Sequence, residues 1–373
     1  MPLVAGVDSS TQSCKVEIRD LDSGDVVAVG RGSHPSTSPP RSEQDPTAWW
    51  SALVDAFAEV GSVAGDVAAI GVGGQQHGLV VLDADDTPLR PAKLWNDTES
   101  AAQAAALAER VGAEAWARRV GSVPVASFTI TKLAWLVEHD PDVIGRIAKV
   151  MLPHDYLNLR LTGVHATDRG DASGSGWFDA KTGEVATELL GLVGGRDDWA
   201  DLTPTVLGPA DTLGTVSSAA AAALGVPAGI PVGVGSGDNM AAALGLGLQP
   251  GDSALSLGTS GVVYAASPTP TADASGAVAG FADATGGFLP LVCTLNATKV
   301  TDTVAGWLGM DQATFAAAAT SAPAGANGAR LTPYFDGERT PNLPDATGTF
   351  EGLRNDITPA DLARAAHEGV LCG

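Results

Sequence analysis

Stretches with the apolar pattern of strands alternate along the chain with stretches that have helical spacing. Residues 3–8 and 14–19 are predicted to be two strands around a turn rich in Ser, Thr and Gln. A third strand is predicted over 26–30, after the hairpin turn signal Asp22-Ser23-Gly24. Ala-rich runs with helical spacing follow, and this alternation predicts an α/β fold.

The same patterns place the remaining elements. Asp45-Pro46 is predicted to open a helix that runs from Thr47 to about Gly61, since Pro suits the first helical turn. The stretch 33–46 before it is rich in Ser and Pro and is predicted to be a loop. Further strands are predicted at 68–73, 79–82 and 232–235, and further helices at 98–111, 113–119, 128–139, 154–161, 239–246 and from Pro359 onward.

The N-terminal hairpin pattern recurs late in the chain. Ser253–Ala266 repeats its layout of strand, short Gly/Ser/Thr turn and strand. This repeat predicts a duplicated α/β domain with the two hairpin tips facing each other. The first domain is predicted to span 1–245 and the second 246–373. The second is expected to be incomplete, because it is much shorter and ends inside its last predicted helix.

Composition and charge narrow the classes of partner. The 373 residues are 45% hydrophobic, and 21 basic against 43 acidic residues give a net charge of −22. Such a field repels nucleic acid and anionic membrane surfaces. The unclustered Cys14, Cys293 and Cys372 are typical of reduced thiols. With no signal-peptide pattern and no apolar stretch of membrane-spanning length, these features predict a soluble cytoplasmic protein.

Two polar hairpin tips are candidates for phosphate binding. Asp8–Ser13 and Gly258–Gly261 are each either a plain turn or a loop whose backbone N–H groups and hydroxyls face a phosphate. The pair is more informative than either tip alone, because a phosphate bound between two domains needs donors from both. The sequence contains no P-loop pattern.

Two strand ends carry the other candidate chemistry. In Gly237-Asp238-Asn239 the aspartate either caps the following helix or accepts a proton from a ligand hydroxyl. Gly74-Gln75-Gln76-His77-Gly78 places two amides and an imidazole between glycines, an arrangement suited to a polyol. Residues 128–136 and 154–163 are interpreted as structural helices, and the histidines have no metal-ligand spacing, so no structural metal is predicted.

Taken together, these segments resemble the FGGY family of carbohydrate kinases, within the actin-like ATPase superfamily, and most of all its D-xylulose kinases. The resemblance follows family order from end to end. Its segments are Gly6–Lys15, Ser42–Pro46 with Trp49-Trp50, Gly74–Gly78, Leu94–Asp97, Ser127–His139, Thr167–Gly174, Gly237–Asn239, Leu257–Gly261, Pro333–Pro341 and Gly348–Glu368.

The resemblance implies two actin-like (ribonuclease H-like) domains with a cleft between them, and transfer of the ATP γ-phosphoryl group to the O5 hydroxyl of D-xylulose. It makes Asp238 the catalytic base and Asp8 the residue that faces Mg²⁺, through water, and phosphate. The implied sugar-binding residues are Gln76, His77, Asp238 and Asn239. Those implied to face the ATP phosphates are Ser10, Thr11, Gly258 and Thr259.

The chain departs from the family in three places. Gln76 stands where many D-xylulose kinases have methionine, and His367 replaces an apolar residue. Family members also continue past residue 373 with the segment that carries the adenine-binding turn. The alternatives are therefore a kinase for another ketose or polyol, an actin-like ATPase without a sugar, and a non-catalytic sugar-binding remnant. The oligomeric state is open, with a homodimer as one alternative.

Overall fold

The computed structural model describes residues 2–37, 40–335, 337–343 and 345–373. Positions 38–39 of the predicted loop, and position 336 of the family segment Pro333–Pro341, lie outside the described residues. The chain forms two compact units. The first comprises Met1–Gly251 with Ala266–Pro290, and the second comprises Asp252–Ala265 with Leu291–Gly373.

The first unit is built on a mixed seven-stranded sheet. Its strand order is β13-β14-β5-β1-β2-β3, with β15 also paired to β5. Strands β1, β2 and β3 are antiparallel neighbours, whereas β5 runs parallel to β1, β14 and β15. The bounds are β1 Leu3–Ser9, β2 Ser13–Asp20, β3 Val26–Ser33, β5 Val67–Gly74, β13 Thr212–Thr215, β14 Pro231–Gly233 and β15 Ser236–Gly237.

Helices and short strands complete this unit. The helices are α1 Pro46–Val60, α2 Ala101–Val111, α3 Ala113–Val120, α4 Thr129–His139, α5 Pro141–Ile144, α6 Pro153–Thr162, α7 Arg169–Ser173, α8 Thr187–Leu190, α9 Ser218–Leu224 and α10 Asp238–Gly245. Short 3₁₀ turns lie at η1 Gly61–Asp66 and η2 Trp199–Leu202. The short strands are β4 Glu43–Gln44, β6 Val80–Leu82, β7 Ala92–Lys93, β8 Lys149–Met151, β9 Ala166–Asp168, β10 Phe178–Asp179, β11 Glu184–Val185, β12 Thr205–Leu207 and β18 Ala279–Ala282.

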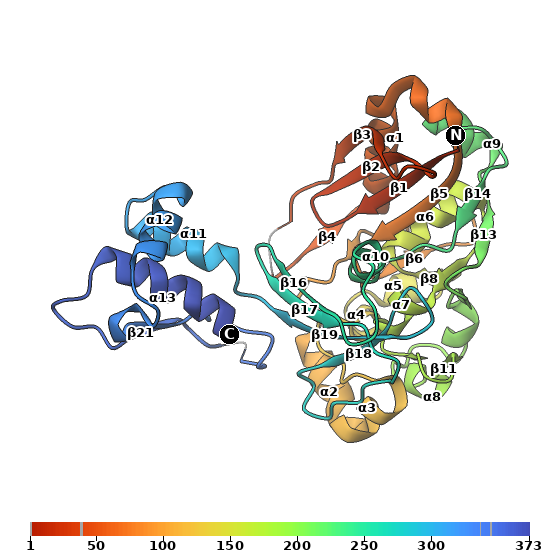
Figure 1. The fold of residues 1–373 in the computed structure, drawn as a ribbon. Helices are drawn as coiled ribbons and strands as arrows, with labels where there is room; N and C mark the ends of the chain where they lie inside the picture. The colour runs from red at the N-terminus through yellow and green to blue at the C-terminus, as the bar shows by residue number, and fades with distance from the viewer. Residues whose placement is uncertain (1, 38–39, 336, 344) are drawn as a thin grey trace. The chain divides into compact units, whose positions relative to one another are not determined.

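Helix α1 covers the sheet over β2 and β3 (Figure 1). It begins where Asp45 accepts a hydrogen bond from the N–H of Thr47, and Pro46 occupies its first turn. The buried face of α1 meets Val16 and Ile18 of β2 in one apolar core. Strand β3 approaches so closely that a Cβ on Gly30 would lie 1.9 Å from the Ala56 carbonyl oxygen. Only glycine allows this separation of helix and sheet.

The second unit combines an antiparallel hairpin with three helices. Strands β16 (Ser253–Leu257) and β17 (Gly261–Ala265) form the hairpin, and β17 also pairs with the end of β19 (Phe288–Thr294). Buried residues from Val300 to Ala366 form the core of this unit. Its other elements are α11 Thr298–Trp307, α12 Gln312–Ser321, η3 Ala326–Gly328, β20 Arg330–Thr332, β21 Thr349–Glu351 and α13 Pro359–Cys372.

The structure confirms the alternating α/β pattern and the repeated hairpin. Strands β1–β2 and β16–β17 are both antiparallel pairs with a short polar tip. The predicted loop 33–46 was wrong in one detail, since Glu43–Gln44 forms strand β4 against β7. A two-residue strand has no periodicity to read, so only pairing with a distant partner identifies it.

Replacing Gly30 with alanine is expected to destabilise the first unit by roughly 1–3 kcal/mol, because the new methyl group overlaps the backbone of α1. Urea unfolding measures the change. Gly71→Ala is the matched control, since a Cβ there meets nothing within 4 Å. Equal stability of the two variants would contradict the packing described for β3 and α1.

Candidate active site

The carboxyl ends of three parallel strands meet at one edge of the first unit's sheet. In the register of β1, β5 and β15, Gly73 lies beside Asp8 on one side and beside Ser236 on the other. The residues that follow these strands therefore gather at the same edge. They are Ser10 and Thr11 after β1, Gln75–His77 after β5, and Asp238 and Asn239 after β15.

Asp238 is the first residue of α10, so it does not cap this helix from outside. Gly237 occupies the N-cap position. The Asp238 Oδ1 atom accepts two hydrogen bonds from Asn239, at 2.8 Å from its backbone N–H and 2.9 Å from its side-chain amide. Burial raises the pKa of Asp238 to about 7; the bond from the Asn239 N–H opposes this shift, and the charges of Asp171 and Asp8 add to it.

A side-chain amide links Asp238 to the residues after β5. The Asn239 Nδ2 atom that binds Asp238 also donates to Gln76 Oε1 at 3.0 Å. Gln76 is buried, and within the described residues its Nε2 atom has no hydrogen-bond partner. A buried donor of this kind is costly unless something binds it, so the amide of Gln76 is suited to a polar ligand.

His77 is held in a strained and closely packed position. Its backbone φ is +66°, which is rare for a residue other than glycine. The ring stacks on Phe128, with centroids 5.2 Å apart and planes 14° apart. Nδ1 lies 3.0 Å from the Gly174 carbonyl oxygen, so Nδ1–H donates. The Thr129 hydroxyl donates to the His77 carbonyl at 3.0 Å.

Asp8 is the exposed member of the site. It lies one residue before the end of β1, opposite Lys15 on β2. The protein around it raises the pKa of the Asp8 carboxyl above its ordinary value, while the charge of Lys15 lowers it. The Lys15 ammonium group itself lies 2.7 Å from Glu17. The Asp8 carboxylate is thus accessible to a cation from solvent.

The turn after β1 is held by residues from elsewhere in the first unit. Trp95 donates its indole N–H to the Thr11 hydroxyl at 2.9 Å. The Gln44 amide donates to the Thr11 carbonyl at 3.0 Å. The Ser10 N–H donates to the Ser13 carbonyl at 3.1 Å, which closes the turn. These bonds fix the backbone of Ser10 and Thr11 in one shape.

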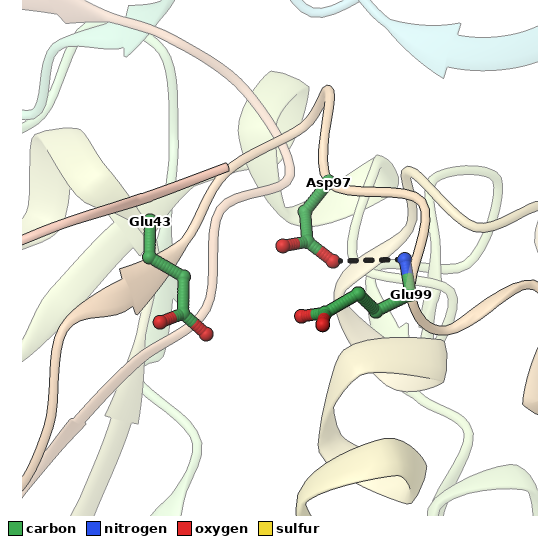
Figure 2. Close-up of side chains that lie close together, drawn as sticks. All are labelled: Glu43, Asp97 and Glu99. Carbon is green, nitrogen blue, oxygen red and sulfur yellow. Dashed lines mark hydrogen bonds between the residues drawn. The ribbon is translucent and has the colours of Figure 1, made fainter. Parts of the chain in front are cut away.

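Three carboxylates from the segments that carry Gln44 and Trp95 lie close together (Figure 2). The oxygens of Glu43, Asp97 and Glu99 lie within 4.8 Å of one another. The ammonium group of Lys93 lies among them, 3.1 Å from both Glu43 and Asp97 and in contact with Glu99. It also lies 3.9 Å from the ring centroid of Trp135. The cluster therefore has a resident cation from the chain itself and is not the magnesium candidate.

The hairpin tip of the second unit carries the other two predicted phosphate residues. The Gly258 carbonyl accepts hydrogen bonds from the N–H and the hydroxyl of Thr298, at 2.9 and 2.7 Å. The Thr259 carbonyl accepts from the Ala297 N–H at 3.2 Å. Helix α11 therefore holds the tip from behind, and Thr259 is exposed.

Both halves of the chain match the sequence profiles of one enzyme family. Residues 3–245 match the N-terminal domain, and residues 253–373 the C-terminal domain, of the FGGY family of carbohydrate kinases. The chain belongs to this family. Across the described residues of this FGGY kinase, none of the helices combines the length and the apolar character needed to cross a membrane.

Individual relatives point in the same direction. The chain is 50% identical to a xylulose kinase of Streptomyces rubiginosus over 371 residues, which are 99% of this chain and 74% of that protein. The crystal structure of xylulose kinase from Bifidobacterium adolescentis matches this fold with a TM-score of 0.87 and a sequence identity of 44%. The match covers all of this chain and 80% of that protein's chain. A ligand-bound xylulose kinase from Lactobacillus acidophilus matches with a TM-score of 0.92 and a sequence identity of 26%. That match covers 100% of this chain and 76% of the other chain.

In this FGGY kinase, the first unit brings Asp8, Ser10, Thr11, Gln76, His77, Asp238 and Asn239 to one sheet edge. Sequence reasoning did not identify four residues that hold them: Gln44, Trp95, Phe128 and Gly174. All four lie within the family segments, but the sequence assigned none of them a role at the site. The contacts of Trp95 and Phe128 join positions 84 and 51 residues apart in the chain, a distance at which no local pattern carries a signal.

Lys93→Met is expected to destabilise this kinase by roughly 3–5 kcal/mol near pH 7, because three carboxylates lose their buried cation. Arg41, Arg90 and Lys93 outweigh burial and hold the pKa of Glu43 below its ordinary value. The ionised Glu43 carboxylate therefore stabilises the folded protein at pH values above its ordinary pKa of about 4. This stabilisation is lost as the pH falls below that value.

The difference in free energy of unfolding between wild type and Lys93→Met should accordingly become smaller below about pH 4, because the carboxylates take up protons there. Urea unfolding at several pH values measures it, with Lys181→Met, at an exposed turn, as the control. A Lys93→Met protein as stable as the Lys181→Met protein at pH 7 would contradict the assigned role of the ammonium group.

Proposed function

We propose that this FGGY kinase transfers the γ-phosphoryl group of ATP to the O5 hydroxyl of D-xylulose and produces D-xylulose 5-phosphate. The observation that carries the proposal is Asp238, a carboxylate with a pKa of about 7 that shares the Asn239 amide with the buried Gln76. The identity of 50% to a protein named xylulose kinase supports the choice of sugar.

Asp238 is proposed as the general base. Both hydrogen bonds from Asn239 go to Oδ1, which leaves Oδ2 as the oxygen that takes the proton from the attacking hydroxyl. A base with a pKa near the working pH is ionised often enough to accept a proton and basic enough to hold it. The proton leaves O5 as that oxygen attacks the γ-phosphorus of ATP and ADP departs.

Gln76, His77 and Asn239 are proposed to bind the sugar hydroxyls. The Gln76 Nε2 group is a buried donor suited to a hydroxyl oxygen. Because the His77 Nδ1–H donates to Gly174, the neutral ring carries its lone pair on Nε2. His77 then presents an acceptor and Gln76 a donor, the combination that a polyol or ketose needs. Phe128 keeps the imidazole in one plane.

Asp8 fits a magnesium site in which the ion keeps most of its water. Its carboxylate is exposed, and the ammonium group of the neighbouring Lys15 binds Glu17 instead. Mg²⁺ usually takes one or two protein carboxylates together with waters and substrate phosphates. When bound, it would neutralise charge on the phosphate oxygens. For these phosphates we propose Ser10 and Thr11 in the first unit, and Gly258 and Thr259 in the second.

A coupled assay of ADP release tests the function, with D-xylulose compared against other pentuloses and polyols. Asp238→Asn keeps the shape of the side chain and removes the base, so turnover should fall by roughly 10²-fold or more. The affinity for D-xylulose should stay within about tenfold. ADP release that needs no sugar, or near wild-type turnover of the variant, would contradict the proposal.

The rate should also depend on pH through Asp238. With a pKa of about 7 the base is protonated in acid, so kcat/KM should rise with pH and level off above pH 7. The same raised pKa means that ionised Asp238 destabilises the folded protein. This destabilisation is present at pH values above about 7 and is relieved as the pH falls through 7 and Asp238 takes up a proton.

Asp238→Asn should therefore unfold at a higher temperature than wild type at pH 8, and the difference should disappear at pH 5. Thermal unfolding at the two pH values measures this. A flat pH–rate profile between pH 5.5 and 8, together with a pH-independent difference in stability, would rule out Asp238 as the titrating base.

A further inference from the structure

Behind the sheet edge lies a group of buried ionisable residues to which the proposed chemistry assigns no contact with sugar or phosphate. His154, on α6, lies 2.9 Å through Nδ1 from Asp171 Oδ2 and 3.5 Å through Nε2 from Asp168 Oδ1. Asp155, its neighbour on α6, lies 3.4 Å from Nδ1. All four side chains are buried, His154 completely. We name His154, Asp168 and Asp171 the histidine clamp.

The histidine clamp is a buried ion-pair network in which the His154 imidazole lies among aspartate side chains. Burial lowers the pKa of His154, but Asp155, Asp171 and Asp168 together raise it to about 10. The imidazole is therefore a cation at neutral pH. Its Nδ1–H donates to Asp171, whereas Nε2 lies within ion-pair distance of Asp168 and has no hydrogen-bond partner among the described residues. Removing one partner from such a buried group is far more disruptive than breaking a surface pair.

Both aspartates of the clamp belong to the start of α7. Asp168 is its N-cap and accepts from the Gly170 N–H at 2.6 Å and the Asp171 N–H at 3.2 Å. Asp171 lies within the helix. A helix of five residues cannot be stable by its own hydrogen bonds, so its position depends on such anchors.

The other end of α7 meets His77. Gly174 follows the helix, and its carbonyl accepts the His77 Nδ1–H at 3.0 Å. The contact is so close that a Cβ on Gly174 would lie 2.2 Å from Nδ1. A shift of α7 by even about 1 Å would break this hydrogen bond. The ring would then be free to lose the tautomer that presents Nε2 as an acceptor.

We propose that the histidine clamp is a positioning device for sugar binding: it anchors α7 so that the Gly174 carbonyl holds the His77 ring in one orientation and one tautomer. The inference rests on the proposed function, in which His77 binds a hydroxyl of the sugar. His154 and Asp171 are positioning residues and do not contact the reacting atoms.

The test is a double-mutant cycle on the binding of D-xylulose, measured by calorimetry without nucleotide, so that Asp238 chemistry does not enter. His154→Gln should weaken binding about five- to tenfold, as expected for one hydrogen bond to the ligand. His77→Ala should weaken it by a similar factor. The double variant should be little worse than His77→Ala alone, because both changes remove the same interaction.

The matched control is His165→Gln. His165 is a half-buried histidine bonded to the Val150 carbonyl, and it has no role in the site. It should leave the affinity unchanged. Additive losses in the His154–His77 cycle, or a folded His154→Gln protein with wild-type affinity, would overturn the proposal.

Two further variants serve if His154→Gln does not fold. Asp171→Asn keeps the size of the side chain and removes its charge. Gly174→Ala keeps all the ionisable groups of the clamp and places a Cβ 2.2 Å from the His77 Nδ1 atom, so the ring or the Gly174 carbonyl must move. Each should weaken binding at least about twofold. Wild-type affinity in either folded variant would contradict the proposal.

Nitrogen NMR of the His77 ring provides a readout that needs no sugar. Wild type should show the Nδ1–H tautomer, and His154→Gln or Asp171→Asn a mixture of tautomers. An unchanged His77 spectrum in a folded clamp variant would refute the inference. Absence of D-xylulose binding by the wild-type protein would refute the proposed function instead, and the NMR comparison would still decide the role of the clamp.

Discussion

The parallel pairing of β5 with β1 and β15 is the constraint on which the site depends. Parallel strands end at the same edge of a sheet, so residues more than 200 positions apart arrive together. Asp8 near the end of β1, Gln76 after β5 and Asp238 after β15 come together for this reason. A slip of one residue in either pairing would turn the side chains to opposite faces and separate Asp238 from the amide of Gln76.

The edge is also where the chain places charges at an energetic cost. Asp238 is half-buried with its pKa raised to about 7, and His77 occupies a strained backbone conformation. Strain and buried charge of this kind persist only where surrounding structure determines them. Three groups support this edge: the Asn239 amide bridge at Asp238, the α7 helix with its buried histidine at His77, and the Lys93 cluster, whose Glu43 is next in sequence to the Gln44 that bonds Thr11.

These supports differ in their physical character, although all three lie in the first unit. The amide bridge is neutral and joins two residues of the site directly. The other two groups place one cation among three carboxylates each, Lys93 in one and His154 in the other. In a chain with a net charge of −22, such internal cations allow acidic residues to be buried together.

The sequence by itself determined the elements and the chemical candidates. Apolar patterning located β1, β2 and β5, and the polar residues at strand ends gave the candidates Thr11, His77 and Asp238. The repeated hairpin near Ser253 was also visible as a pattern. All of these signals are local, since they arise from the period of a strand or helix and from the conformational preferences of Gly, Pro and Asn.

Only the tertiary structure decided what holds those candidates. The clamp on α7, the Trp95 bond to Thr11 and the stacking of Phe128 on His77 join residues that are distant in the chain. The sequence alone favoured a structural role for His154 and for the 128–136 helix, and both are buried as that interpretation requires. What links His154 and this helix to the site is the set of side chains that they contact: Asp171 for His154, and His77 for Phe128. These contacts are determined only by tertiary packing, because a buried charge or polar atom must pair with a group on whichever element packs against it.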